Sequence, residues 1–223
     1  MIIKVDLHVH TSPCSLDSLI QVDDLLETCD YKCIDCVALT DHDEIECAIK
    51  LHEKAPSRII VGEEIHTTEG EMIGLFLKER VEPGLTPAET ADKIKEQGGL
   101  VYIPHPFDKM RASVIKKKCF DEILPKVDII EVYNSRNVFR WSNHSALSYA
   151  QKNNILAGVG SDAHSKFEVG QAYVLIDEFT SAEDFLTKLA DAEYHKNKTP
   201  AVFNLVNKIY KMARSAKRNI ITH

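Results

Sequence analysis

Six short apolar runs in this 223-residue chain end in side chains that can hold a metal ion. The first run, residues 2–7, is followed by His8 and His10. Because alternate side chains of a β-strand point to one face, these two imidazoles would form a chelating pair for Zn²⁺, Mn²⁺ or Fe²⁺. The other five runs are followed by Asp41 and His42, by Glu63 and Glu64, by His105, by Glu131, and by Asp162 and His164.

These candidate ligands are spread along the chain from His8 to His164. They can meet at one point only if the fold brings the ends of several strands together. Taken singly, each pair could equally be a helix cap or a polar group of the core. A buried cluster of imidazoles and carboxylates is costly unless a cation compensates its charge. The whole set therefore predicts a metal-binding site.

Strands and helices are expected to alternate along most of the chain. Apolar runs predict strands at residues 2–7, 37–40, 59–62, 71–77, 100–103, 128–133, 155–159 and 172–176. Helical spacing and capping residues predict helices at residues 19–29, 44–54, 86–97, 142–152, 181–190 and 201–216, and one or two helices within 109–125.

This alternation predicts a largely parallel sheet of the α/β class. The strand count permits a barrel of about seven strands or a doubly wound sheet, and residues 71–77 could form a hairpin with residues 59–62. An open sheet would place functional residues at one or two switch points, whereas a barrel gathers the carboxyl ends of its strands at one mouth. Ligands at nearly every strand end therefore favour a (β/α) barrel.

Composition narrows the class of protein further. The hydrophobic content of 44% argues against disorder, and the net charge of -7 argues against a protein whose whole body binds nucleic acid. No apolar run is long enough for a membrane span, and the N-terminus does not resemble a signal peptide, so we expect a cytoplasmic protein. In that compartment the six cysteines, including Cys33 and Cys36 of a C-x-x-C, should be free thiols rather than disulfides.

The C-terminal part has a different charge. From Tyr194 onward there is no Asp or Glu, while seven Lys and Arg side chains occur there: Lys196, Lys198, Lys208, Lys211, Arg214, Lys217 and Arg218. We interpret residues 1–195 as the barrel domain and residues 196–223 as a basic helical extension. That extension could follow a polyanion, or it could dock its apolar face on the barrel with its charges in water.

The motifs together resemble those of the polymerase and histidinol phosphatase (PHP) family. They occur in the order D-x-H-x-H, T-D-H, G-x-E, P-H-P and S-D-A-H, over roughly residues 3–176. The resemblance implies a distorted (β/α)7 TIM-like barrel with two or three divalent ions (Mn, Zn or Fe) at the strand ends. It also implies hydrolysis of phosphoesters.

Carried over residue by residue, the resemblance implies that seven side chains are metal ligands: His8, His10, His42, Glu64, His105, Asp162 and His164. Two positions depart from the family pattern. Asp17 stands near the place of a further ligand that often follows H-x-H. Glu71 stands where many members have a histidine, and it could be a substitute ligand or a polar strand end. His66 is expected to lie outside the ligand set.

The implied reaction is attack of a metal-activated hydroxide on the phosphorus of a small phosphate monoester, a nucleotide or a short oligonucleotide. Asp41, His164 and Arg136 are the candidate catalytic residues. Arg136, together with Lys109, Arg111 and Arg140, is expected to bind the substrate phosphate because these cations follow predicted strand ends. The alternatives are a nuclease, a histidinol-phosphate-type phosphatase, and a noncatalytic metal-stabilised module that binds through the basic extension.

Overall fold

The computed structural model describes residues 1–200, 202 and 203. The strands are β1 (Ile2–Val9), β2 (Cys36–Leu39), β3 (Ile59–Thr67), β4 (Gly70–Leu75), β5 (Leu100–Ile103), β6 (Ile129–Asn134), β7 (Leu156–Gly160), β8 (Ala172–Asp177) and β9 (Glu193–Lys196). The helices are α1 (Leu25–Lys32), α2 (Glu46–Lys54), α3 (Pro87–Glu96), α4 (Lys117–Ile123), α5 (Arg140–Asn153) and α6 (Ala182–Leu189). The helix expected over residues 201–216, and the basic side chains from Lys208 on, lie outside the described residues.

The strands form a nearly closed, barrel-like sheet in the order β7-β6-β5-β4-β3-β2-β1-β8-β9. Strand β4 runs antiparallel to both β3 and β5, which confirms the expected hairpin and distorts the barrel. A bridge between Val9 and Ala163 brings the end of β1 to the chain that follows β7. The predicted α/β barrel is therefore confirmed. Strands β8 and β9 extend the sheet antiparallel on the other edge of β1.

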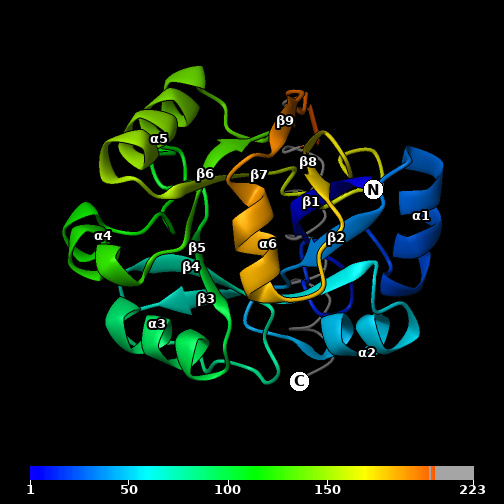
Figure 1. Ribbon diagram of the computed structural model, residues 1–223, viewed down its shortest axis with the longest axis horizontal. Coiled ribbons are helices and arrows are strands. Elements are labelled where there is room, and N and C mark those ends of the chain that lie inside the picture. The colour runs from blue at the N-terminus through cyan, green and yellow to red at the C-terminus, as the bar shows by residue number, and fades with distance from the viewer. Residues whose placement is uncertain (201, 204–223) are drawn as a thin grey trace, which may run out of the picture.

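The helices cover the outside and one end of the barrel. In Figure 1 helices α1 to α5 surround the strands, while α6 crosses in front of them. Phe185 of α6 is fully buried and packs 5.4 Å from Phe76, measured between ring centroids. Because Phe76 follows the antiparallel strand β4, it lies at the end of the barrel away from the carboxyl ends of the parallel strands. Helix α6 thus closes the end opposite to the predicted ligands.

Local signals explain which helices form where expected. The predicted capping box is present at α3, where the amide of Glu89 donates to the Thr86 hydroxyl and the amide of Thr86 donates to the Glu89 carboxylate. The helix expected from residue 19 instead begins as a single turn at Val22–Asp24 before α1. The reason is long-range pairing: the amide of Leu19 donates to the carbonyl of His164 at 2.7 Å.

The cysteine prediction was wrong at two positions. Cys14 and Cys47 form a disulfide that links the segment after β1 to the start of α2. Thirty-three positions separate these cysteines, so their spacing carried no signal of the pairing. Cys29 and Cys36 are buried free thiols, as expected. Among the described residues, no helix is both long enough and apolar enough to cross a membrane.

Two neighbouring glutamates of β3 point to opposite faces of the sheet. Glu64 points into the barrel, whereas Glu63 is buried on the other face, where its Oε2 accepts a hydrogen bond from the Val81 amide at 2.8 Å. Burial raises the pKa of Glu63 from 4.5 to about 8, and the Val81 amide and the Arg80 guanidinium only partly oppose this. At neutral pH, the Glu63 side chain of the folded protein is therefore mostly in its protonated, uncharged form.

The substitution Glu63→Gln should remove a contribution to the free energy of unfolding that depends on pH. Since the pKa of Glu63 is higher in the folded state than in the unfolded state, the folded protein binds the extra proton. The free energy of unfolding of the unsubstituted protein should thus fall, relative to that of the Gln variant, as the pH rises from about 4.5 to about 8. Urea unfolding across this range measures the difference. A constant difference, or the same trend in the exposed control Glu79→Gln, would contradict the assignment.

Gly160 at the end of β7 is expected to tolerate no side chain. A Cβ atom there would lie 2.4 Å from the Cβ of His8 and 2.7 Å from a carboxylate oxygen of Glu131. Gly160→Ala should therefore cost about 1–3 kcal/mol of stability by overpacking and should weaken Mn²⁺ binding by displacing His8. Urea unfolding and Mn²⁺ titration measure the two effects. Gly84→Ala is the control, because a Cβ there meets no atom within 4 Å and only its φ of +83° is unfavourable; it should leave Mn²⁺ affinity unchanged.

Candidate metal centre

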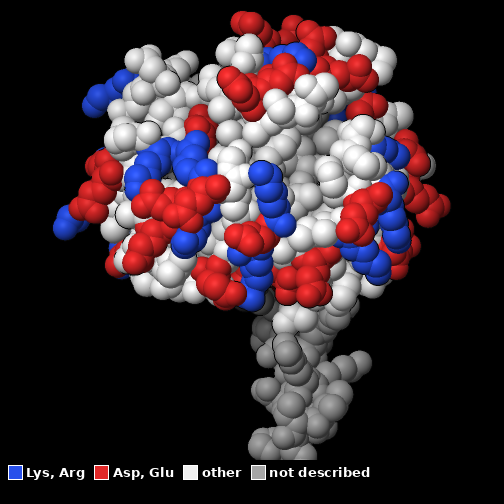
Figure 2. Space-filling model, turned by 60° about the horizontal axis from the view of Figure 1, so that its bottom comes forward, with Lys and Arg blue, Asp and Glu red and all other residues white. Residues whose placement is uncertain are grey.

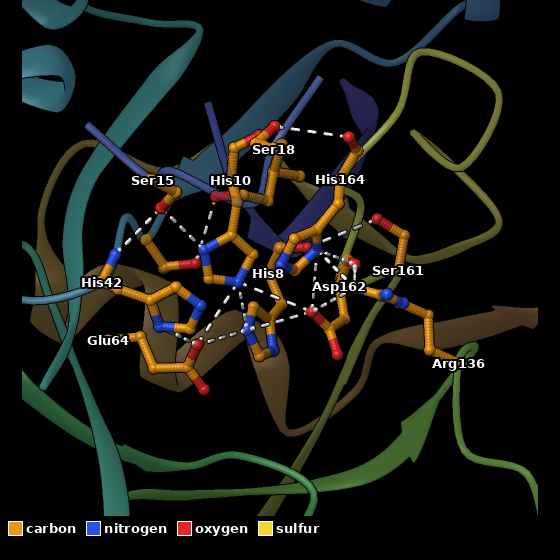
Figure 3. A network of polar contacts seen from close by, with 12 residues as sticks. His8, His10, Ser15, Ser18, His42, Glu64, Arg136, Ser161, Asp162 and His164 are labelled. Carbon is orange, nitrogen blue, oxygen red and sulfur yellow. Dashed lines mark hydrogen bonds and ion pairs between the residues drawn. The ribbon is translucent and has the colours of Figure 1, made fainter. Parts of the chain in front are cut away.

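One buried carboxylate, that of Glu64, lies at the middle of the predicted ligands. Its Oε2 is 3.4 Å from Nε2 of His8, 3.3 Å from Nε2 of His10 and 3.2 Å from Nδ1 of His42, and its Oε1 is 3.1 Å from Nε2 of His105. Two donors that each lie about 2.1 Å from one ion are about 3.0–3.4 Å apart. The spacing around Glu64 therefore suits shared metal ions (Figure 3).

Asp162 forms the other side of the centre. Its Oδ1 lies 3.5 Å from Nε2 of His10, 3.8 Å from Nε2 of His8 and 3.4 Å from Nδ1 of His164. Asp17 approaches from the segment after β1, with one oxygen 3.6 Å from Nε2 of His42 and the other 3.7 Å from Nε2 of His164. The fold thus brings the seven implied ligands and Asp17, the candidate for a further ligand, into one cluster.

Backbone strain accompanies two of these ligands. His105 has a φ of 32° and Asp162 a φ of 55°, in the left-handed region that favours glycine. Both residues follow barrel strands, β5 and β7, and both side chains are buried. Strained backbone of this kind persists where the surrounding structure holds it in place, and it is concentrated at functional sites.

The contacts of His8 and His10 show that the centre suits a cation. Nδ1 of His8 donates to Glu131 at 3.0 Å, and Nδ1 of His10 lies 3.3 Å from the Ser15 hydroxyl oxygen, whose own proton is donated to Asp41. In its neutral form each imidazole would thereby present Nε2 as an acceptor, and the two Nε2 atoms are 3.0 Å apart. Two facing acceptors repel unless a proton or a metal ion lies between them.

The pKa values reflect the same demand for positive charge. Burial would lower the pKa of His8, but the carboxylates of Glu64, Asp162 and Glu131 raise it well above its usual value. Burial, with the neighbouring His42, lowers the pKa of His10 to about 4. A neutral imidazole is the form that binds metal.

Unsatisfied polar atoms support the fit. Within the part of the chain that the structure describes, Nδ1 of His42 and Oδ1 of Asp162 are buried without a hydrogen-bond partner. Both atoms face Glu64 or His10 in the cluster. Buried polar atoms are costly without a partner, and coordination of a divalent ion would supply one.

Two arginines contact Asp162 from the rim of the centre. Nη2 of Arg111 donates to Oδ2 of Asp162, and Nη1 of Arg136 lies 3.6 Å from Oδ1 of Asp162 and beside Nδ1 of His164. Burial would raise the pKa of Asp162, but Arg111, His8 and Arg136 bring it well below its usual range. The carboxylate is therefore ionised, and two guanidinium groups lie where an anion could approach the metal ligands.

The other two predicted phosphate-binding cations lie elsewhere. Nζ of Lys109 lies over the exposed ring of Trp141, 5.1 Å from its centroid. Arg140, the first residue of α5, lines a separate cavity together with Lys196 and Lys198. Of the four predicted cations, Arg111 and Arg136 thus contact the ligand cluster directly.

Asp41 holds the segment after β1 in place. Its Oδ1 accepts from the Thr11 amide at 2.6 Å and from the Ser15 hydroxyl at 2.7 Å, and its Oδ2 accepts from the Thr11 hydroxyl at 2.8 Å. Through Ser15 it also orients His10. Burial raises the pKa of Asp41 to about 6, and these hydrogen bonds oppose the shift. The contacts indicate a positioning role.

Glu131 is a strand residue that the family resemblance does not place among the metal ligands. It is buried beneath the cluster, where it accepts from Nδ1 of His8, from the Tyr102 hydroxyl at 3.1 Å and from the His105 amide at 2.7 Å. A carboxylate that orients a metal-binding histidine is a common second layer of such sites. Its position in β6, directly after the apolar residues of a barrel strand, was the available signal.

Glu71 lies between the predicted ligand His105 and the half-exposed His66. Its Oε2 is 3.7 Å from Nε2 of His105, and its Oε1 is 2.9 Å from Nε2 of His66. Nδ1 of His66 in turn lies 2.9 Å from Oδ2 of Asp43. His66 faces Glu71 across the β3–β4 pair, so strand register fixes the contact. His66 is half exposed, whereas Glu71 is buried.

The sequence is similar to one family model and to two proteins of an archaeon. A family model described as PHP-associated matches residues 140–194. The uncharacterized protein MJ0417 of Methanocaldococcus jannaschii is 42% identical over 180 residues, which are 78% of this chain and 71% of that protein. MJ1587 of the same organism is 38% identical over 143 residues, covering 59% of this chain and 83% of the relative.

Solved structures share the fold at 16% identity. PsfC of Pseudomonas syringae has a TM-score of 0.69 and covers 95% of this chain and 98% of its own. A two-domain protein of Bacteroides vulgatus containing a predicted PHP-like metal-dependent phosphoesterase has a TM-score of 0.67, and this chain spans 65% of it, less than two thirds. Endonuclease Q, solved with a 27-mer duplex that carries an abasic lesion at the active site, has a TM-score of 0.64 over 86% of this chain and 57% of its own.

The match to MJ0417 is long enough to show a family, whereas the solved structures at 16% identity show the fold. The chain belongs to the same family as MJ0417, carries a PHP-associated segment at residues 140–194 and has a PHP-like barrel fold.

Proposed function

We propose that the protein hydrolyses a small phosphate monoester or a nucleotide at the centre around Glu64. The observation that carries this proposal is the meeting of His8, His10 and Glu64 with an ionised Asp162 that two arginines contact. Imidazoles and carboxylates at these separations suit divalent ions such as Mn²⁺, Zn²⁺ or Fe²⁺. Guanidinium groups at the same carboxylate suit phosphate oxygens, which they bind bidentately.

Different residues around the centre would have different roles in such a reaction. Bound divalent ions would polarise a phosphoryl oxygen and lower the pKa of a bound water so that it can attack phosphorus at neutral pH. Arg111 and Arg136 would orient the phosphate and stabilise its growing negative charge. Burial and the Arg136 charge lower the pKa of His164 well below its usual value, so this imidazole is neutral, which is the form in which it would hold a metal ion. Asp41 would act by holding Ser15 and His10.

Two enzymatic alternatives use the same centre. A nuclease is favoured by the shared fold with Endonuclease Q, and a histidinol-phosphate-type phosphatase by the family motifs. On the face shown in Figure 2, acidic and basic side chains are intermixed and form no continuous basic surface. The noncatalytic alternative relies on basic residues outside the described part of the chain.

A panel of phosphomonoesters, nucleotides and oligonucleotides, assayed with Mn²⁺, Zn²⁺ or Fe²⁺, tests the proposal. We expect turnover of a monoester or nucleotide. Replacement of Arg136 by Met should lower kcat/KM about 10²–10³-fold, because a preorganised positive charge at the phosphate is lost.

The matched control is Arg58→Met. Arg58 precedes β3 at the opposite end of the barrel, where it contacts Asp30 at 2.7 Å, so its replacement should leave kcat/KM unchanged. Bound metal with no turnover of any member of the panel would sink the enzymatic proposal and favour the noncatalytic module. Cleavage of oligonucleotides alone would favour the nuclease.

We also propose that Glu71 is a metal ligand, held in position by His66 and Asp43. The support is its buried carboxylate 3.7 Å from Nε2 of His105, together with the Glu71–His66–Asp43 chain of contacts behind it. A carboxylate in this position makes the site richer in oxygen donors, which suits Mn²⁺ better than an imidazole would.

Metal counting tests this assignment independently of activity. Glu71→Gln should weaken the binding of one Mn²⁺ ion at least about 10-fold, seen by calorimetric titration and by metal analysis after dialysis. His66→Ala should weaken the same ion less, since it removes only the support. The exposed control Glu79→Gln should bind Mn²⁺ like the unsubstituted protein. An unchanged stoichiometry and affinity in Glu71→Gln would show that Glu71 is only a polar strand end.

A further inference from the structure

The cavity that Arg140 lines has a volume of about 480 Å³ and lies between α5 and the end of β9. Its walls carry four basic side chains: Arg140, His144, Lys196 and Lys198. Among the described residues that line it there is no Asp or Glu, although the chain as a whole has a net charge of -7. A cavity of this size is large enough for a small organic ligand, and its lining selects an anion.

The basic side chains come from two elements that line the same cavity. Arg140 and His144 are four positions apart on α5, so they lie on the same face of the helix. Lys196 and Lys198 are two positions apart at the end of β9, so their side chains lie on the same side of an extended chain. Neutral donors complete the lining, with the side-chain amides of Asn137, Asn143 and Asn197.

The wall of this cavity is connected to the metal centre by hydrogen bonds. Oδ1 of Asn143 accepts from the Asn134 amide at 3.2 Å and from the Asn137 side chain at 2.6 Å. The Asn134 side chain donates to Oδ2 of Asp162 at 3.2 Å, and its Oδ1 accepts from the Arg136 amide at 2.9 Å. The side chain that faces the cavity is thus two hydrogen bonds away from a predicted metal ligand.

The segment between β6 and α5 forms the partition between the two sites. Arg136 reaches from it toward Asp162, while Asn137 and Arg140 face the cavity. Nζ of Lys198 donates to the carbonyl of Val138 at 2.7 Å, which ties the β9 side of the cavity to the same segment. A ligand in the cavity would therefore contact the segment that positions Arg136.

We propose that this cavity binds the phosphate group of a small organic phosphate, held chiefly by Arg140 and Lys196. Phosphate is favoured over a carboxylate because three Lys and Arg side chains line the cavity, and a phosphate offers more acceptor oxygens at higher charge. The ligand has two sources with this same chemistry. It is either the distal phosphate of the substrate that reacts at the metal centre or a separate phosphate that acts on the Arg136 segment. The binding itself goes beyond the proposed hydrolysis and does not depend on turnover.

Calorimetric titration with inorganic phosphate tests the site in the full chain treated with a chelator, so that metal-bound phosphate does not contribute. We expect the double variant R140Q/K196Q to lose one phosphate site or to weaken it at least 10-fold. Both side chains are exposed, so the fold should persist, and Lys196→Gln alone provides a milder variant. The control Lys152→Gln, exposed further along α5, should bind phosphate like the unsubstituted protein.

A second control separates this cavity from the mouth of the metal centre. Arg111→Gln removes a cation that contacts Asp162 and should leave the cavity site intact. If the isotherms of the unsubstituted protein and of R140Q/K196Q coincide, or if Arg111→Gln abolishes all phosphate binding, the proposal is overturned. Failure of the hydrolytic proposal would not alter these isotherms.

Kinetics on any substrates turned over by the loaded enzyme then distinguish the two sources. If the cavity holds the distal phosphate of the substrate, R140Q/K196Q should raise KM for a bisphosphate and not for the matching monophosphate. If it holds a separate phosphate, added phosphate should change kcat for the monophosphate in the unsubstituted protein and not in R140Q/K196Q. An identical response of both proteins in all these assays would contradict a role for the cavity.

Discussion

The structure depends on the compensation of charge at the carboxyl ends of the barrel strands. Glu64 and Asp162 are buried carboxylates, and four imidazoles converge on Glu64 within 3.1–3.4 Å. Charged groups at this depth are costly unless opposite charge and hydrogen bonds surround them. Arginines supply part of that charge from the rim, and the pair of Nε2 atoms of His8 and His10 indicates where a metal ion would supply more.

This demand explains features of the surrounding fold. Glu131 and Asp41 do not complete the ligand set; they fix His8 and, through Ser15, His10 so that each Nε2 faces the centre. The strained backbone at His105 and Asp162 serves the same geometry. Gly160 leaves room for β7 to approach His8 closely. Much of the polar interior is thus devoted to orientation, as is common around metal sites.

Much of the fold and of the metal centre was predictable because it follows from the spacing of apolar and polar residues along each strand and helix. Alternating apolar runs predicted a largely parallel α/β sheet, and ligand side chains at nearly every strand end, such as His8, Glu64, His105 and Asp162, favoured the barrel that brings them together. Other features depend on contacts between distant segments and left no local signal. The Cys14–Cys47 disulfide and strand β9 are of this kind. So is the position of Arg140, which follows a strand end but faces a different cavity.

The central claim is that the imidazoles and carboxylates around Glu64 form a metal centre. Anomalous diffraction from crystals of the full chain grown with Mn²⁺ tests it most directly. The account predicts anomalous peaks within coordination distance of Glu64, between the Nε2 atoms of His8 and His10 on one side and that of His105 on the other. An absence of peaks there, with these side chains in the same positions, would contradict it.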